Sequence, residues 1–242
     1  MNKIFLCLKI IFISHLSLHA DEKWIEGTSQ PRERITISSP VDEVVEEVLV
    51  EEGDSVSKGD VLAKLLSKKQ ELAAKKLDNL ISKAKFEYEA VKDLYEKKIE
   101  SRANYLEKKA ILGGFEVDKL MAENDVSDRL IKSPSDGVIV YRLIDPGESA
   151  EKVKALFELI DVSSLQLVFF LSTEYLDSFK LGDHVGVEFP EVKNNSTGKA
   201  VLKFIDPQVD SRSGLFRLRF EFDNKDAKIK PGVRVRMKLP KN

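Results

Sequence analysis

Apolar and polar positions follow two different periods along this chain. In residues 35–66, 131–160 and 161–242, short runs rich in valine, isoleucine, leucine and phenylalanine alternate with polar residues and are separated by glycine-containing turns. A period of two is typical of β-strands. Residues 67–130 instead lack proline, contain glycine only at 113 and 114, and are dominated by Lys, Glu, Ala and Leu. The pattern therefore predicts a mainly β protein with a long helical insertion.

The two β segments that flank the insertion are near-copies of one another. Residues 39–65 align without a gap with residues 133–159, at an offset of 94 positions, and "VVEEVLV" faces "VIVYRLI". Gly53, Gly137 and Gly147 are expected at turns, where glycine supplies a positive φ. Because one half with four short strands cannot bury its apolar face alone, we expect the two copies to pack as one small β-sandwich.

Leucine and alanine recur at multiples of seven along the insertion. Leu66, Ala73, Leu80 and Leu94, interleaved with Leu77, Ala84 and Val91, form a seam of coiled-coil type, and Leu106, Ala110, Val117 and Leu120 partly resume such a seam. Ser101 and Asn104 offer capping oxygens at a weak point in this pattern, which suggests a turn.

Two antiparallel helices of about 30 residues would project about 45 Å at 1.5 Å per residue. A single solvated helix is the alternative, but it would hold residues 66 and 131 apart although their flanking repeats need to pair. Gly113 and Gly114 cost up to about 1 kcal/mol each inside a helix. We therefore expect a kink, a break or a close helix contact there.

The C-terminal segment returns to strands separated by loops. The stretches "LQLVFFLS", "HVGVEFP", "KAVLKFID", "GLFRLRFEF" and "VRVRMKLP" have the alternation of half-buried antiparallel strands, and "STEYLDSFKLGD" looks like one short helix. Together with the strand-like "KWIEG" near the N-terminus, these strands predict a small barrel.

The first twenty residues have the composition of an export signal. Lys3 and Lys9 supply positive charge, residues 4–18 are mostly apolar, and Ala20 is a small residue just before the acidic stretch "DEKW". This composition indicates a signal peptide, with an uncleaved N-terminal anchor as the alternative. The only cysteine, Cys7, lies inside this run, so no disulfide is expected in the mature chain. With 39 basic and 41 acidic residues, the chain offers no sign of nucleic-acid binding.

Candidate catalytic and metal-binding residues are few. The histidines are His15, His19 and His184, and no nucleophile has an evident histidine and acid partner. Asp206, Asp210 and Glu221 are scattered carboxylates typical of solvated strand ends. Met121 and Met237 are the only methionines after the signal, too few for a soft-metal relay. We expect neither an enzyme nor a bound metal or cofactor.

The stretches "SPVDEVVEEVLVEEGDSVSKGDVLAKL", "IKSPSDGVIVYRLIDPGESA" and "VDSRSGLFRLRFEF...IKPGVRVRMKL", with the helical insertion between the first two, resemble periplasmic adaptor proteins of the HlyD and RND-efflux type, also called membrane fusion proteins. The resemblance implies a biotinyl/lipoyl-like β-sandwich split by an α-helical hairpin, followed by a β-barrel. It implies the following boundaries: 1–20 signal, 21–34 N-terminal barrel strand, 35–66 and 131–160 the two lipoyl-like halves, 67–130 the hairpin, and 161–242 the barrel.

The resemblance also implies partners and a place in the cell. Family members lie in the periplasm, associate with the inner membrane, and connect an inner-membrane transporter to a TolC-like outer-membrane channel. Self-association into a ring is implied as well, as a hexamer or a trimer of dimers. An RND pump is the expected transporter, and a MacB-like ABC exporter is the alternative. Because little chain precedes Trp24 or follows the barrel, we expect transporter contact on the barrel and the lower sandwich.

The resemblance points to the hairpin tip as the channel-binding site. Many efflux adaptors carry an Arg, then a Leu four residues later and a Ser seven residues after that. Here Leu94 and Ser101 keep the second interval and Arg102 follows, but Ala90 occupies the Arg position. Leu94 and Ser101 could equally be a seam residue and a helix cap.

A lipoyl or biotinyl carrier is the rival from another class. Such a domain presents a modifiable lysine at a hairpin between its halves, a place that the insertion occupies here. Lys68 and Lys69 lie near that position, at an expected helix start, without the sequence context of a carrier lysine.

Overall fold

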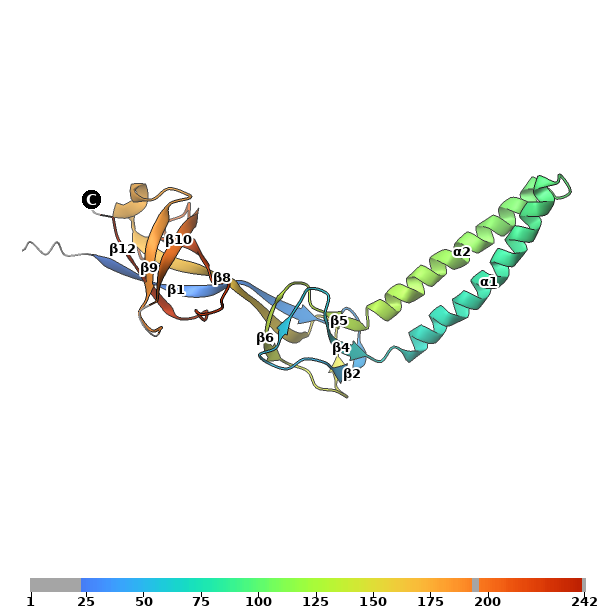
Figure 1. Cartoon of the computed structure of the whole chain (residues 1–242), viewed down its shortest axis with the longest axis horizontal. Helices are drawn as coiled ribbons and strands as arrows, with labels where there is room; N and C mark the ends of the chain where they lie inside the picture. The colour runs from blue at the N-terminus through green and yellow to red at the C-terminus, as the bar shows by residue number, and fades with distance from the viewer. Residues whose placement is uncertain (1–22, 193–195, 241–242) are drawn as a thin grey trace, which may run out of the picture. The chain divides into compact units, whose positions relative to one another are not determined.

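The computed structural model describes residues 23–192 and 196–240, and the predicted signal segment lies outside them. The described residues divide into two compact units, one formed by residues 23–28, 168–192, 196–220 and 234–240 and the other by residues 29–167 and 221–233 (Figure 1). No helix in the described part of the chain is both long and apolar enough to cross a lipid bilayer.

The first unit is built from antiparallel strands that close on themselves. Around it the order of strands is β1, β12, β9, β10, β11 and β8, and β8 pairs again with β1. Strands β1, β8 and β11 each continue into the second unit. The bounds are β1 Trp24–Ser38, β8 Ala155–Ser172, β9 His184–Phe189, β10 Ser196–Ile205, β11 Leu215–Asp223 and β12 Arg234–Lys238, with one 3-10 helix, η1, at Thr173–Ser178. The predicted barrel is therefore present, and its short helix is a 3-10 helix.

Aromatic side chains fill the interior of this barrel. The alternation in β11 places Phe216, Leu218 and Phe220 on the buried face. The rings of Phe169 and Phe220 meet edge to face with centroids 5.6 Å apart. Edge-to-face contacts between aromatic rings stabilise a protein in addition to the effect of the apolar area that the rings bury.

The second unit contains the sandwich formed by the two repeats. Within it β2 pairs with β4 and β7, β4 pairs with β5, and β6 pairs with β3 and β8. Each half therefore lends one short strand to the other. The bounds are β2 Glu43–Val48, β3 Ser55–Val56, β4 Val61–Leu65, β5 Leu130–Lys132, β6 Gly137–Arg142 and β7 Ser149–Ala150.

Backbone hydrogen bonds between the halves come in pairs related by the offset of 94 residues. The Gly53 amide donates to the Ile139 carbonyl at 2.8 Å, and the Gly147 amide donates to the Val45 carbonyl at 2.8 Å. The predicted repeat is thus two interlocked halves of a single folded unit.

Two aspartates repeat this exchange with their side chains. A carboxylate oxygen of Asp42 in the first half accepts from the Lys152 amide at 2.7 Å, and its copy, Asp136, accepts from the Lys58 amide at 2.8 Å. Each of these hydrogen bonds therefore crosses from one half to the other.

One apolar cluster lies between the halves and contains matching residues of both. Val45, Leu62 and Leu65 are buried together with their copies, and Phe157 joins them. A half alone would expose these side chains to water, so the sandwich forms only when both copies are in place.

The three repeat glycines serve two different purposes. Gly53 and Gly147 have φ angles of 97° and 87° and lie in turns, as expected. Gly137 does not lie in a turn: it begins strand β6, and a Cβ on it would come within 2.6 Å of the Ile160 carbonyl oxygen. The turn expected at Gly137 is therefore wrong, and glycine is needed there because β8 approaches closely.

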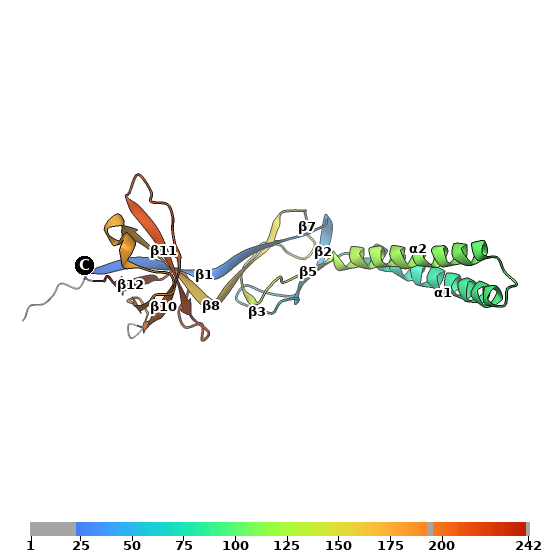
Figure 2. The same ribbon diagram turned by 90° about the horizontal axis from the view of Figure 1, so that it is seen from above.

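The insertion forms the predicted hairpin of two helices, α1 (Lys68–Glu96) and α2 (Arg102–Ser127), which run side by side (Figure 2). Both ends of the hairpin are held by the sandwich, where the Leu65 amide donates to the Arg129 carbonyl at 2.9 Å. On α1 the predicted seam is partly right, because Ala84 is buried and Leu77, Leu80 and Val91 are half-buried, while Ala73 and Leu94 face solvent.

The predicted seam on α2 is wrong. Its members Leu106, Ala110, Val117 and Leu120 are exposed. The face that contacts α1 is offset by about one residue and includes Tyr105, Lys108, Leu112, Phe115 and Lys119.

Gly113 and Gly114 do not interrupt α2. The helix is continuous from Arg102 to Ser127, and a Cβ on either glycine would meet nothing within 4 Å. The expected break or close contact within the chain is therefore absent, and the glycines leave open space on the helix surface.

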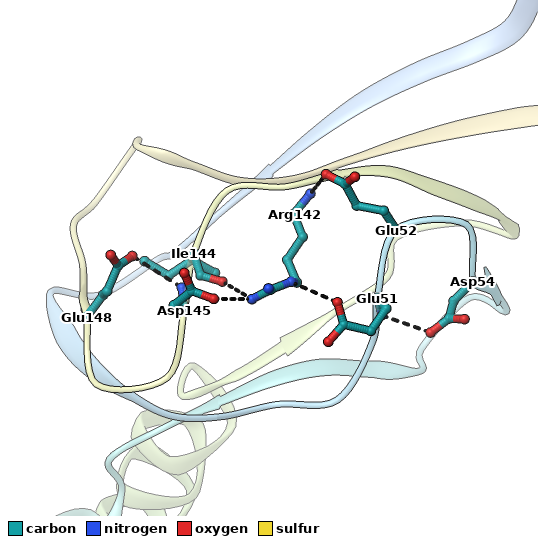
Figure 3. Close-up of polar contacts among 7 residues, drawn as sticks. All are labelled: Glu51, Glu52, Asp54, Arg142, Ile144, Asp145 and Glu148. Carbon is teal, nitrogen blue, oxygen red and sulfur yellow. Dashed lines mark hydrogen bonds and ion pairs between the residues drawn. The ribbon is translucent and has the colours of Figure 1, made fainter.

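Arg142 joins the turns of the two halves (Figure 3). Its guanidinium bonds to the Ile144 carbonyl at 2.9 Å and to the carboxylate of Asp145, and it forms an ion pair with Glu51 at 3.1 Å. The Arg142 amide also donates to a Glu52 carboxylate oxygen at 3.1 Å. The hydrogen bond to Asp145 is the main reason that the pKa of Arg142 is raised further above its already high value.

We predict that Gly147→Val lowers the free energy of unfolding by about 1–3 kcal/mol, because a β-branched residue resists a positive φ. Gly114→Ala is the matched control, since a side chain at either site meets open space. Gly114→Ala should raise the free energy of unfolding by up to about 1 kcal/mol, because alanine is more favourable than glycine in a helix interior. Denaturant unfolding measures both, and equal effects of the same sign would contradict the role of backbone conformation.

We also predict that Arg142→Met lowers the Tm more than Lys64→Met does. Both cations pair with carboxylates, but Lys64 reaches only the neighbouring strand, at Glu47, whereas Arg142 connects the two halves. Exposed single pairs contribute little. A thermal melt of the two variants checks this, and indistinguishable Tm values would show that Arg142 does not hold the halves together.

Candidate partner-binding site at the hairpin tip

The tip is a tight turn closed by backbone hydrogen bonds. The Leu94 carbonyl accepts from the Ile99 amide at 2.8 Å and from the Glu100 amide at 3.3 Å. Lys98 adopts a left-handed conformation with φ of 61°. These bonds end α1 within one turn and reverse the chain.

Ser101 begins α2 as its N-cap. The hydroxyl oxygen accepts from the Asn104 amide at 3.1 Å, which satisfies one of the free amides of the first turn. A Glu100 carboxylate oxygen accepts from the Ser101 amide and from the Asn104 side chain, each at 3.1 Å. Of the two roles considered for Ser101, the structure places it in the helix cap.

Three tyrosines support the turn from below. Tyr95 stacks on Tyr105 with ring centroids 4.9 Å apart and an interplanar angle of 9°. The hydroxyl groups of Tyr88 and Tyr105 lie 3.4 Å apart, and this hydrogen bond raises the pKa of Tyr88. The aromatic cluster fixes the ends of both helices relative to each other.

An ion pair lies one turn further down the hairpin. Lys108 of α2 donates to Glu87 of α1 at 2.7 Å. The hydrogen bond lowers the pKa of Glu87 and raises the pKa of Lys108, so both groups remain charged over a wider pH range.

The tip presents an apolar surface to solvent. Ile99 is 69% exposed and Leu94 is 37% exposed. Arg102 is exposed beside them and makes no ion pair with any described residue. The site residues considered from the sequence, Leu94, Ser101 and Arg102, thus lie together in one turn, and Ala90 lies exposed one turn below Leu94.

Ile99 is a tip residue that the sequence pattern did not single out. An isolated isoleucine within the charged run "EKKIESR" is the signal that could have identified it, because a turn gives such a side chain nothing to pack against. The arrangement suits a protein contact: a small apolar centre with polar and cationic residues around it resembles the anatomy of protein interfaces.

No group of three or more His, Cys, Asp or Glu side chains in 23–192 and 196–240 is arranged to hold a metal ion. Lys68 and Lys69 lie in the first turn of α1, where Lys68 forms a 3.8 Å ion pair with Glu71.

Two family models match the chain, and together they cover nearly all of the described residues. Residues 33–161 match the CzcB-like barrel-sandwich hybrid domain, and residues 172–242 match the CusB-like β-barrel domain. The first match includes both repeats and the hairpin, and the second includes most of the barrel strands.

Two curated relatives are similar over most of the chain. An uncharacterized protein of Haemophilus influenzae is 25% identical over 217 residues, which are 88% of this chain and 56% of the relative. The cobalt-zinc-cadmium resistance protein CzcB of Cupriavidus metallidurans is 27% identical over 207 residues, 72% of this chain and 39% of CzcB. The chain therefore spans about half or less of the length of these relatives.

A solved structure has the same fold. The crystal structure of a MacA-MexA chimeric protein, which contains the Pseudomonas aeruginosa MexA α-hairpin domain, superposes with a TM-score of 0.77 at 16% identity and covers 90% of this chain and 80% of the chimera. With the sandwich, hairpin and barrel all accounted for, the chain belongs to the CzcB-like barrel-sandwich hybrid family of membrane fusion proteins.

Proposed function

We propose that this protein is the periplasmic adaptor of a tripartite export system. In this role it is non-catalytic, lies in the periplasm in association with the inner membrane, and connects an inner-membrane transporter to a TolC-like outer-membrane channel. The observation that carries the proposal is a helical hairpin that ends in an exposed apolar turn, joined to a sandwich and a barrel of the membrane fusion type.

The tip supports the channel contact. Ile99 and Leu94 offer apolar area that is free in the described chain, and the N-cap and the tyrosine stack keep the turn in one conformation. A turn that is ordered before binding loses little conformational entropy when it binds. Leu94 and Ile99 then supply the contact, and Ser101 maintains its shape.

The barrel supports the transporter contact. A groove of about 740 Å³ on it is lined by Phe170, Leu215, Asp206, Asp210, Arg212 and Arg217, among others. Phe170 of β8 is 54% exposed and contributes apolar area to this groove.

An RND pump is the transporter that we propose, because the barrel matches a CusB-like domain. A MacB-like ABC exporter is the alternative, and the fold shared with the MacA-MexA chimera is its support. A carrier role is not favoured, because Lys68 and Lys69 lie within a helix turn rather than at the tip of a β-hairpin.

We predict that a photo-crosslinking amino acid at Ile99 captures an outer-membrane channel protein in cells, and that one at Phe170 captures an inner-membrane transporter. Mass spectrometry of the adducts identifies the partner and distinguishes an RND pump from an ABC exporter. Ile99 is a better position than Ser101, because replacing Ser101 removes the helix cap. If cells that carry the crosslinker at Ile99 export normally and no adduct forms at Ile99, channel docking through the tip is excluded.

Substitutions at the same turn separate binding from folding. Ile99→Asp should abolish export with an unchanged Tm, because the side chain is mostly in water. Ser101→Ala should lower the free energy of unfolding of the hairpin by about 1 kcal/mol through loss of the cap. It should leave export largely intact. Full export by the Ile99→Asp variant would count against the proposed contact.

A further inference from the structure

A second groove of the barrel has an exposed glycine in its floor. It has a volume of about 500 Å³ and lies along β9, where Gly186 is exposed. The residues that line it include Trp24, His184, Lys238 and Pro240. A volume of this size falls within the range of small-molecule sites.

The barrel itself gives no reason for a glycine at position 186. Strand β9 pairs with β10 in regular register from His184 to Phe189, without a bulge, and Gly186 has no positive φ. A Cβ on Gly186 would meet nothing within 4 Å, whereas one on Gly27 of β1 would collide with the Val168 carbonyl oxygen. Glycine weakens a strand interior and often marks a place where a ligand approaches the backbone closely. Gly186 is a candidate for such a place.

Cross-strand pairing places one lysine on each side of Gly186. Lys199 of β10 lies opposite Gly186. On the other side, Met237 of β12 pairs with Val187, so the next pair in this antiparallel register is Lys238 with Gly186. Met237 and Val187 are buried, and the residues next to them along each strand therefore point to the outer face. Opposite residues lie about 5 Å apart. Both lysines therefore border the open floor.

The acidic side chains that line this groove already have partners. Glu188 accepts from the Arg236 guanidinium at 3.0 Å. Asp183 accepts from the Lys180 amide at 2.7 Å, in the turn that precedes β9. Lys199, by contrast, makes no ion pair with any described residue. The charge left without a partner beside the floor is thus positive, and charged donors of this kind make their strong hydrogen bonds to anions.

Trp24 supplies an aromatic wall with cations against its ring. The Lys238 ammonium lies 5.1 Å from the centroid of the indole, and the Arg236 guanidinium carbon lies 4.6 Å from it. Such contacts are attractive because the face of the ring is negative. Trp24 is only half-buried, so part of its apolar surface stays available, and Pro240 adds more. Apolar walls with a few polar groups that fix orientation are typical of small-molecule sites.

From these observations we infer that this groove of the barrel binds a small organic anion with an aromatic ring, such as an aromatic carboxylate. The ring lies against the backbone at Gly186, beside Trp24, and the anionic group pairs with Lys199 and Lys238. This site adds a small molecule to the protein partners of the proposed function and does not depend on them.

Other kinds of occupant fit this groove less well. A cationic ligand would meet a lysine on each side of the floor, and a neutral ligand would leave Lys199 without a counter-charge. A strand of a partner protein cannot extend the sheet here, because β9 is already paired with β10 on one side and with β12 on the other.

Trp24 reports on the site, because it is the only tryptophan of the chain. The purified full-length protein is titrated with naphthoate, and the quenching of Trp24 fluorescence is followed. Naphthamide, which has the same ring without the charge, is the matched control ligand, and N-acetyltryptophanamide corrects for light that the ligand absorbs. We expect saturable quenching by naphthoate with at least tenfold higher affinity than for naphthamide.

A side chain on the floor should block the site without harming the fold. Gly186→Val should weaken naphthoate binding at least tenfold, because the valine side chain occupies the place of the ring. The Tm should stay the same or rise, because valine is favoured in strands and meets open space there. Unchanged affinity in a folded Gly186→Val variant would overturn the inference.

A lysine pair separates specific pairing from general charge. Lys199→Gln should weaken naphthoate binding about fivefold or more and leave naphthamide binding unchanged. Lys203→Gln is the matched control, because Lys203 lies four residues further along β10, about 13 Å away, and should have no effect. Equal losses in both variants would show attraction to the overall charge of the barrel and would overturn a site at Gly186.

The remaining outcomes also decide the matter. Equal affinity for naphthoate and naphthamide would show that the groove does not select anions, and the absence of saturable quenching would show that it holds no such ligand. A blue shift of Trp24 emission with phosphatidylglycerol vesicles, without any response to naphthoate, would indicate that this face binds a lipid surface instead. Each of these results would overturn the inference.

Discussion

The exchange of hydrogen bonds between the two repeats is the constraint on which the rest of this unit depends. The Gly53 and Gly147 amides each reach a carbonyl of the opposite half, and Asp42 and Asp136 do the same with their side chains. Each half therefore completes the other. The two halves are separated in sequence by the whole hairpin. Folding of the sandwich therefore requires that the two ends of the hairpin come together, which costs loop-closure entropy.

The pairing of the two halves also holds the two helices of the hairpin together at their base. Strands β4 and β5 hold the start of α1 beside the end of α2, and the Tyr95–Tyr105 stack and the Ser101 cap hold the helices at the other end. Ile99 therefore lies on a turn whose flanking helices are paired at both ends. A turn that is already ordered before binding loses less conformational entropy when it binds.

The fold was largely predictable because the strand pattern of the sandwich occurs twice in the sequence. Two copies of the same strand pattern, with matching glycines and leucines, leave few other ways to bury both. The α2 seam was not predictable in the same way: the helix has two heptad stripes, one through Leu112 and the other through Leu106, and periodicity alone does not say which one faces α1. Gly137 illustrates another limit, since a glycine needed for close strand approach looks the same in sequence as one needed for a turn. At the tip, Ser101 could be identified as a cap from its position, whereas the exposure of Ile99 depends on how tightly the turn closes.

The anchoring of both helix ends in one pair of strands has a consequence for how such proteins can diversify. Inserting seven residues into α1 and seven into α2 at the same height would lengthen the hairpin by about 10 Å. It would leave β4, β5 and the apolar cluster unchanged and preserve the faces of both helices. The length of the hairpin can thus change in whole heptads, independently of the sandwich that carries it.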